Sequence, residues 1–171
     1  MVACRIMFYN KNMKILPLEI FYIYFSPYTS HAVEIDGMVY PTVEHAYQCQ
    51  RYTDKKIINE IIEATSPVKA WEVSTKYKHL QIPEFKKEQY KLKIMKKLMK
   101  LKAKQHEEVK KALIDSGNMK IVKHIVTYPP GDGFWDDGED GKGLNHIGKM
   151  WMEIRKEVKK ETFINQSHVT S

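Results

Sequence analysis

The stretch HAVEIDGMVYPTVEHAYQCQRY, residues 31–52, decides the fold because it places a strand pair and a helix in immediate succession. Residues 31–35 and 38–40 flank Asp36–Gly37, a pair suited to the positive backbone angles of a two-residue hairpin turn. Thr42 is then expected to cap a helix by accepting a hydrogen bond from an amide of its first turn. The stretch therefore predicts a β-hairpin that leads directly into a helix.

Signals for further helices occupy much of the chain after this stretch. Asp54 and Ser66–Pro67 are expected helix starts, because aspartate and serine cap well and proline suits the first helical position. Apolar side chains at helical spacing predict three more helices. These cover residues 86–104, 107–115 and 145–160. Two apolar segments, 20–25 and 119–126, are expected to be strands. A few strands beside a run of helices predict an α+β fold, a single, mostly helical domain with a small β-sheet.

The length of 171 residues fits one domain. We expect an N-terminal extension at 1–19, the domain at 20–160 and a polar tail at 161–171. Hydrophobic content of 43% and charged content of 29% are typical of a globular protein. No apolar run approaches the roughly 18 residues of a membrane-spanning helix. The two cysteines do not make a disulfide framework, which favours a cytoplasmic protein.

The formal net charge of +7 favours anionic partners. A dense set of lysines over residues 86–111 is typical of a solvated helix face and, less often, of a nucleic-acid-binding surface. This segment contains one tyrosine, Tyr90, and no arginine, whereas a nucleic-acid-binding segment more often has arginine or interleaved aromatic residues, so binding to duplex DNA is not favoured.

Residues 127–148, TYPPGDGFWDDGEDGKGLNHIG, do not have the composition of a core element. Five of the eight glycines lie between Gly131 and Gly143, together with five acidic residues and the pair Phe134–Trp135. Glycine lets a backbone approach a ligand closely, and an exposed aromatic pair can stack on a flat ring. An ordinary acidic surface loop is the alternative, although long irregular loops in compact domains tend to be functional or disordered.

Glu44 is the first candidate for chemistry. It lies in the first turn of the helix after Thr42, where free amides and the helix dipole favour a carboxylate. Glu44, Gln48 and Arg51 share one face of that helix. If this polar stripe lines a cleft, Glu44 is a candidate general acid or base and Arg51 a candidate clamp for an anion. A stripe that faces solvent is the alternative.

Lys102 is the second candidate. It follows Leu98 by four residues and Met99 by three, which places it at the edge of the apolar stripe of its helix. A lysine amine that is partly desolvated there becomes a better nucleophile. The alternative is a lysine whose stem packs on the stripe while its ammonium group reaches water. The seven histidines show no paired ligand spacing, so no metal site is expected.

Four segments of the chain resemble, in order and spacing, the NADAR family, whose best-known branch is YbiA-like. They are YPTVEHAYQCQRY (40–52), SPVKA (66–70), LKAKQH (101–106) and FWDDGEDGKGLNHIGKMWMEIR (134–155). The resemblance covers residues 21–157. It implies an α+β fold and cleavage of N-glycosidic bonds in phosphorylated ribosyl compounds, with no metal or redox cofactor.

The resemblance also implies a set of site residues. Glu44 matches the motif glutamate, and Lys102 matches a lysine for which a Schiff-base route is proposed, so both are expected to be catalytic. The residues expected to bind substrate are Tyr40, Gln48, Arg51, Phe85, Phe134, Trp135, Asp136, Gly138 and Asn145. Phe85 stands where the family has tryptophan, and Asp136 where it has glycine. Glu44 and Trp135 are expected to line one substrate pocket.

Two substrate branches are implied by the same resemblance. One hydrolyses early riboflavin-pathway intermediates between base and ribose phosphate, and the other removes ADP-ribose from guanine in nucleic acid or nucleosides. The expected partner is thus an ADP-ribosyl or ribosyl-phosphate substrate, including ADP-ribosylated nucleic acid, and no membrane. A non-catalytic module that binds ADP-ribose or a related nucleotide is the alternative function, and a nucleic-acid-binding protein is a third.

Overall fold

The computed structural model of the chain describes residues 14–124 and 132–169. The chain divides into two compact units. Unit 1 comprises Met1–Ser26 and Glu107–Ser171, and unit 2 comprises Pro27–His106. Helices predominate in the described residues, whose named strands form one two-stranded antiparallel sheet. This composition confirms the predicted α+β class.

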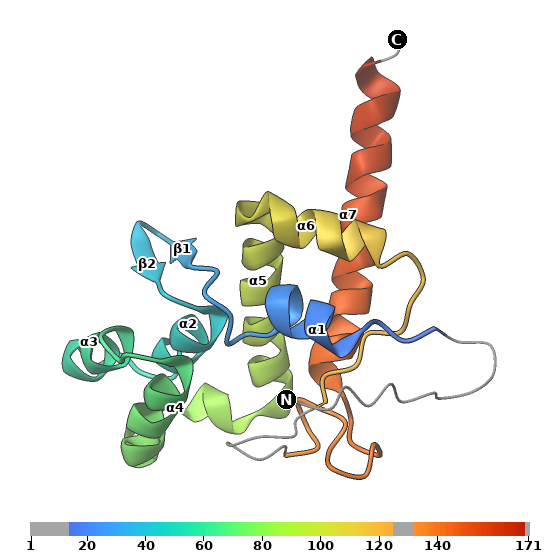
Figure 1. The fold of residues 1–171 in the computed structure, drawn as a ribbon. Coiled ribbons are helices and arrows are strands. Elements are labelled where there is room, and N and C mark those ends of the chain that lie inside the picture. The colour runs from blue at the N-terminus through green and yellow to red at the C-terminus, as the bar shows by residue number, and fades with distance from the viewer. Residues whose placement is uncertain (1–13, 125–131, 170–171) are drawn as a thin grey trace. The chain divides into compact units, whose positions relative to one another are not determined.

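Unit 2 contains the predicted hairpin. Strands β1 (Val33–Ile35) and β2 (Met38–Tyr40) pair antiparallel and lead directly into the first helix of the unit (Figure 1). Asp36 and Gly37 have φ angles of 52° and 81°. Both residues of the turn therefore occupy the left-handed region that a type I′ turn requires, and the hairpin prediction is confirmed.

Three capped helices follow and pack on one another within unit 2 (Figure 1). They are α2 (Val43–Cys49), α3 (Lys55–Ile62) and α4 (Pro67–Lys76). The side chains of Thr42, Asp54 and Ser66 each accept a hydrogen bond from a backbone N–H in the first turn. These bonds satisfy donors that a helix start leaves free, and all three predicted starts are confirmed.

Helix α5 (Glu88–Gln105) follows two short 3₁₀ turns, η2 (Lys78–Leu80) and η3 (Pro83–Lys86). It contacts α2, β1 and η3. Its buried residues are Met95, Leu98, Met99, Lys102 and Ala103. At its C-terminal end, the Gln105 side chain binds the backbone N–H and carbonyl of Glu34, each at 2.9 Å. These two bonds hold the hairpin against the helix.

Unit 1 contains the remaining helices. They are α1 (Leu18–Ile20), the π-helical turn η1 (Phe21–Phe25), α6 (Glu107–Asp115) and α7 (His146–Val169). The predicted strand over residues 20–25 is wrong, because the segment is helical. Phe21 and Phe25 are fully buried, whereas Ile23 between them is 54% exposed. A strand would place all three on one face, so their burial follows the helical period instead.

The predicted strand over residues 119–126 is also wrong for its described part, which ends at residue 124. There Lys120 forms a single parallel bridge to Ile15. Two backbone hydrogen bonds of 2.9 Å join Lys120 to the residues on either side of Ile15. Over residues 119–124 the segment pairs at one residue only, so this described part does not form a strand.

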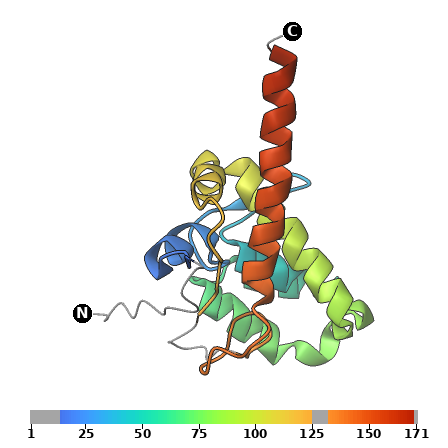
Figure 2. The ribbon, with the colours of Figure 1, turned by 90° about the vertical axis from the view of Figure 1, so that its right-hand side faces the viewer.

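Helices α6 and α7 pack together in unit 1. Arg155 of α7 donates from Nη1 to Ser116 Oγ, just beyond the end of α6, at 2.7 Å. The helix predicted to end at residue 160 continues to Val169, and both views show this end extending past α6 (Figures 1 and 2). Within the described part of the chain, none of the helices combines the length and the apolar character needed to cross a membrane.

Candidate active site

Helix α2 places two polar side chains in the interior. All seven residues of the helix are buried, which excludes the solvent-facing alternative for its polar stripe. Glu44 is 6% exposed and Gln48 is 2% exposed. Gln48 Nε2 donates to Glu44 Oε1 at 2.6 Å, and Gln48 Oε1 has no hydrogen-bond partner among the described residues. A buried carboxylate beside a free amide acceptor is suited to holding a polar ligand group.

Arg51 follows α2 and stands over two aromatic rings. Its guanidinium carbon is 5.5 Å from the ring centroid of Tyr47 and 5.7 Å from that of Phe85, distances at which a cation is attracted to a ring face. Nη1 donates to Ser74 Oγ at 3.4 Å, whereas Nε is buried and has no hydrogen-bond partner within the part of the chain that the structure describes. The guanidinium group therefore keeps a donor for an anion such as phosphate.

Phe85 and Tyr40, both predicted to bind substrate, are buried in unit 2. The Phe85 ring is fully buried and meets Tyr47 and Tyr90 edge-on, at centroid distances of 5.6 and 5.3 Å. Tyr40 is 6% exposed, and burial raises the pKa of its phenol. Phe85 therefore packs beneath the Arg51 guanidinium group. Stacking of Phe85 or Tyr40 on a substrate base stays a prediction.

Lys102 is buried more deeply than its expected place at the edge of the apolar stripe. It is 1% exposed, which excludes the alternative of a lysine that reaches water. Its Nζ donates to Thr29 Oγ1 at 2.6 Å. Helix α5, which carries Lys102, packs against α2, which carries Glu44. Unit 2 therefore buries an acidic and a basic candidate on two neighbouring helices.

Two other titratable groups of α2 are unsuited to chemistry at neutral pH. Burial raises the pKa of Cys49 to about 12, so its thiol does not supply a thiolate nucleophile. Burial also lowers the pKa of His45. The two ring nitrogens of His45 lie 2.8 Å from Thr42 Oγ1 and 3.1 Å from the Ala64 carbonyl. His45 is therefore a neutral structural residue, and Glu44 is the better candidate for acid–base chemistry on this helix.

In unit 1 the described part of the glycine loop is residues 132–148, and residues 127–131 of the predicted loop lie outside the described residues. The Asp132 carboxylate accepts the backbone N–H groups of Phe134 and Trp135, each at 2.9 Å. The two aromatic rings meet edge to face at a centroid distance of 4.8 Å. This pair is partly exposed, so it can stack on a ligand.

The turn after the aromatic pair is built around the buried carboxylate of Asp136. This side chain, 1% exposed, accepts the backbone N–H groups of Gly133 and Gly138 at 3.0 and 2.9 Å. A Cβ atom at Gly143 would lie 2.6 Å from the Asp136 carbonyl oxygen, so the loop needs glycine there. Asp136 shapes the loop from inside, and direct contact of Asp136 or Gly138 with substrate stays a prediction.

Asn145 joins the end of the loop to the segment that precedes it. Its Oδ1 accepts the Lys123 N–H at 2.9 Å, and its Nδ2 donates to the Ile121 carbonyl at 3.0 Å. A second link is made by His124 Nδ1, which lies 2.8 Å from Asp137 Oδ1. The Asn145 amide thus fixes the loop within unit 1, and its predicted contact with substrate is untested.

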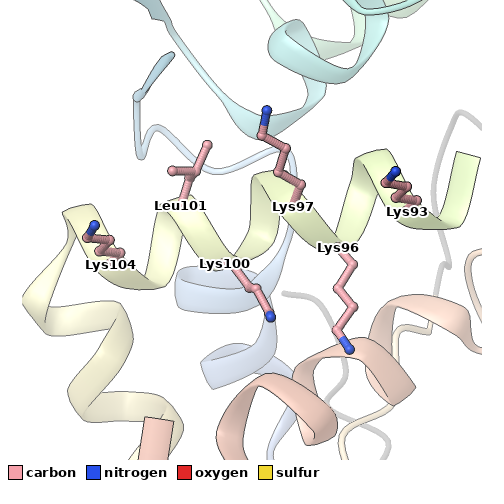
Figure 3. Close-up of a pocket in the computed structure, with 6 residues that line it drawn as sticks. All are labelled: Lys93, Lys96, Lys97, Lys100, Leu101 and Lys104. Atoms are coloured by element: carbon pink, nitrogen blue, oxygen red, sulfur yellow. The ribbon is translucent and has the colours of Figure 1, made fainter. Parts of the chain in front are cut away.

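An open groove of about 420 Å³ lies along α5 (Figure 3). It is lined by Lys93, Lys96, Lys97, Lys100, Leu101 and Lys104. At 3.6 residues per turn, Lys93 and Lys102 lie on opposite faces of the helix. The groove is therefore a basic surface, and the Lys102 amine does not line it.

The predicted site residues fall into two groups. Unit 2 holds Tyr40, Glu44, Gln48, Arg51, Phe85 and Lys102, and unit 1 holds Phe134, Trp135, Asp136, Gly138 and Asn145. The pocket expected to be shared by Glu44 and Trp135 stays a prediction. Sequence reasoning missed Thr29, because it lies 73 positions from its partner Lys102 and no local motif marks it.

A family model described as the NADAR domain matches residues 7–159. The chain belongs to the NADAR family. The NMR structure of YbiA from E. coli is similar to this NADAR chain, with a TM-score of 0.75 and 28% sequence identity over 94% of both chains. The predicted family and fold are confirmed.

Relatives of this NADAR protein carry names that give the class of reaction. N-glycosidase YbiA of Shigella flexneri serotype 5b (strain 8401) is 32% identical over 135 residues, which cover 78% of this chain and 80% of the relative. N-glycosidase Npun_R5314 of Nostoc punctiforme is 29% identical over 141 residues, 79% of this chain and 85% of the relative. Riboflavin biosynthesis protein VVA0006 of Vibrio vulnificus is 25% identical over 134 residues, 78% of this chain but 35% of that protein. These relatives confirm the predicted enzyme class, a hydrolase acting on N-glycosidic bonds.

Proposed function

We propose that this protein hydrolyses the bond between base and ribose in ADP-ribosylated guanine or in a phosphoribosyl intermediate of riboflavin synthesis. The observation that carries the proposal is the burial of Glu44 on α2 and Lys102 on α5, two helices that pack together. A buried carboxylate and a buried amine are costly to fold, and such groups cluster at functional sites. Cleavage at an anomeric carbon uses both groups.

Lys102 acts as a neutral amine that attacks the anomeric carbon. The new carbon–nitrogen bond forms while the bond from that carbon to the base breaks, and its electron pair leaves with the base. Glu44 stabilises the positive charge that develops at this carbon, takes the proton that the attached nitrogen loses and passes it to the departing base.

Release of the sugar needs only water. The ribose ring opens as the lysine nitrogen forms a protonated imine, and the ring oxygen takes a proton from water. The resulting hydroxide adds to the imine carbon, and breakdown of this adduct gives the sugar aldehyde and regenerates the lysine amine. Direct attack of water on the anomeric carbon, with Glu44 as base, is the alternative route.

The other predicted residues bind and orient the substrate in this proposal. Arg51 Nε and Gln48 Oε1 are the buried atoms described above that have no hydrogen-bond partner among the described residues. In this proposal, Arg51 Nε donates to a phosphate oxygen and Gln48 Oε1 accepts from a ribose hydroxyl. Phe134 and Trp135 stack on the base. Asp136, Gly138 and Asn145 hold the loop that carries this aromatic pair.

The proposed function is tested by incubating the protein with ADP-ribosylated guanosine and, separately, with a pyrimidine ribosyl-phosphate precursor of riboflavin. Mass spectrometry then detects free ADP-ribose with guanosine in the first reaction, or sugar phosphate with free base in the second. Cleavage of one compound selects that branch. A protein that binds either compound but returns it intact is the non-catalytic nucleotide-binding module instead.

The lysines of α5 support nucleic acid as the carrier of an ADP-ribosylated base. Helix α5 has seven lysines and one acidic residue, Glu88. Three of these lysines, Lys93, Lys97 and Lys104, are exposed on one side of α5, along the groove (Figure 3). Lys93 and Lys104 are 11 positions apart, about 16 Å along the helix, which matches roughly five phosphates of one DNA strand at about 3.4 Å each. Helix α5 contains no arginine that could contact base edges. Its lysines would contact phosphates, and such contacts do not depend on the DNA sequence.

Changing Lys93, Lys97 and Lys104 together to glutamine is expected to weaken binding to a labelled DNA duplex and to flatten its salt dependence. The slope of log K against log salt concentration should fall in magnitude by about 0.9 for each phosphate that is no longer neutralised, or roughly 2 to 3 in all. Fluorescence anisotropy over a salt series measures this slope. The matched control changes three exposed lysines of unit 2 outside α5, Lys55, Lys56 and Lys78. If the control lowers the slope as much, binding reflects net charge alone and the surface assignment fails.

A further inference from the structure

The Lys102 amine is fully enclosed, yet its proposed attack on the anomeric carbon requires the neutral form, so an ammonium group at this position must first lose a proton. At 1% exposure, its ammonium group has no direct route to bulk water. An ammonium group has three N–H donors and no lone pair, so it can lose a proton only to a lone pair on a neighbouring atom. Thr29 Oγ1 provides such a lone pair at 2.6 Å from Nζ.

Thr29 has a second contact that continues away from the amine. Its Oγ1 also lies 3.0 Å from Nδ1 of His31. Because the oxygen accepts from Lys102, the contact with an unprotonated Nδ1 of His31 is one in which the Thr29 hydroxyl donates. His31 is only half-buried, so its ring can exchange protons with solvent. The three side chains form a chain of hydrogen bonds from the interior to the surface of unit 2.

We infer that Thr29 and His31 form a proton path through which the ammonium form of Lys102 loses its proton to give the neutral amine that attacks. One N–H bond of the ammonium group breaks and its proton moves to Thr29 Oγ1, while the hydroxyl hydrogen moves to His31 Nδ1. A neutral amine and an imidazolium ion result, so the net charge of the three groups does not change. Histidine suits this role because its ordinary pKa lies near neutrality. The inference rests on the proposed function of Lys102.

The neighbouring His106 ring leaves His31 in a position to exchange a proton with Thr29. The His106 ring lies edge-on to the His31 ring at a centroid distance of 5.0 Å. His106 Nε2 lies 2.6 Å from the Ala32 carbonyl, so this ring donates from Nε2. His106 therefore orients the segment that carries His31 and leaves the contact between His31 and Thr29 in place. Thr29 and His31 are positioning and proton-transfer residues in this scheme, and neither contacts the sugar.

The first test compares Thr29→Val with Thr29→Ser. Valine keeps the shape of the side chain and removes the hydroxyl, whereas serine keeps the hydroxyl. Thr29→Val is expected to lower kcat on the order of 10²-fold with KM little changed, and Thr29→Ser to retain wild-type kcat within about threefold. If the two variants lose activity equally, the role of Thr29 is packing, and the inference is overturned.

The second test uses chemical rescue and does not depend on the stability of the Thr29 variants. His31→Ala is expected to slow turnover and the rate of borohydride trapping, and added imidazole is expected to restore both by supplying the missing base. Rescue by imidazole but not by the same concentration of a non-basic heterocycle supports the path. A His31→Ala protein with wild-type rates, or one that imidazole leaves unchanged, overturns it. Inactivity of the wild-type protein on both substrates would instead refute the proposed function.

Discussion

Replacing Glu44 by glutamine is expected to lower kcat on the order of 10³-fold while the protein remains folded. The substitution keeps the size of the side chain and an oxygen that can accept from Gln48 Nε2, the bond of 2.6 Å seen in α2. It removes the negative charge that stabilises the sugar cation and the basic oxygen that carries the proton. Activity is measured by mass spectrometry on whichever substrate the wild-type protein cleaves, and folding by thermal unfolding.

The matched control for this change is Glu63→Gln. Glu63 lies at the C-terminal end of α3 in the same unit and is exposed. The control removes an equal charge and should leave kcat within about twofold of wild type. Full turnover in Glu44→Gln would remove the central residue of the proposal, whatever the other variants do.

Replacing Lys102 by methionine is expected to abolish both turnover and covalent trapping in a protein that still folds. Borohydride reduces an imine to a stable amine, so the wild-type protein treated during turnover gains the mass of the sugar moiety, and Lys102→Met does not. Methionine has a similar length and no charge to desolvate. Methionine also leaves the Thr29 hydroxyl without the donor that Lys102 supplies at 2.6 Å, so the free energy of unfolding is expected to fall by roughly 1–3 kcal/mol. Denaturant titration measures it.

The control for trapping is Lys86→Met, which changes an exposed lysine of η3 in the same unit. It should form the adduct at the wild-type rate. Peptide mapping of the wild-type adduct should place the added mass in the segment that contains Lys102. An active wild-type protein with no adduct would leave direct attack of water, with Glu44 as base, as the route of hydrolysis.

The elements that were predicted correctly from the sequence are those fixed by interactions between residues close together in the chain. The hydroxyl or carboxylate of Thr42, Asp54 or Ser66 binds an amide two or three residues away, so each cap can be identified from adjacent residues. The Asp36–Gly37 turn is similar, because the positive φ angles it needs are properties of those two residues.

The errors come from segments whose structure depends on distant partners. The run at residues 20–25 is apolar and aromatic, and such a short run is compatible with a strand or a buried helical turn. Its conformation follows from packing, for the Phe25 ring lies 5.1 Å from that of Trp151. The extended segment at Lys120 pairs with residues 14–16, and nothing in its own residues specifies that partner.

The candidate site shows the same division. Helical spacing placed Glu44 and Gln48 on one face, and they are hydrogen-bonded. Spacing also placed Lys102 near the apolar stripe, but its exposure of 1% depends on how α5 packs within unit 2, which spacing does not reveal. Thr29 and His31 were missed for the same reason, since their relation to Lys102 exists only in three dimensions.

The division of the chain into a continuous unit and a discontinuous one bears on the order of folding during synthesis. Residues 27–106 leave the ribosome as one uninterrupted piece and can assemble at once. The segment that contains Phe25 must wait, because the indole N–H of Trp151 that binds the Phe25 carbonyl at 2.8 Å is made 126 positions later. Until α7 emerges, Phe21 and Phe25 of the nascent chain lack the cover seen in the finished protein, which makes this interval the period when aggregation or chaperone capture is most favoured.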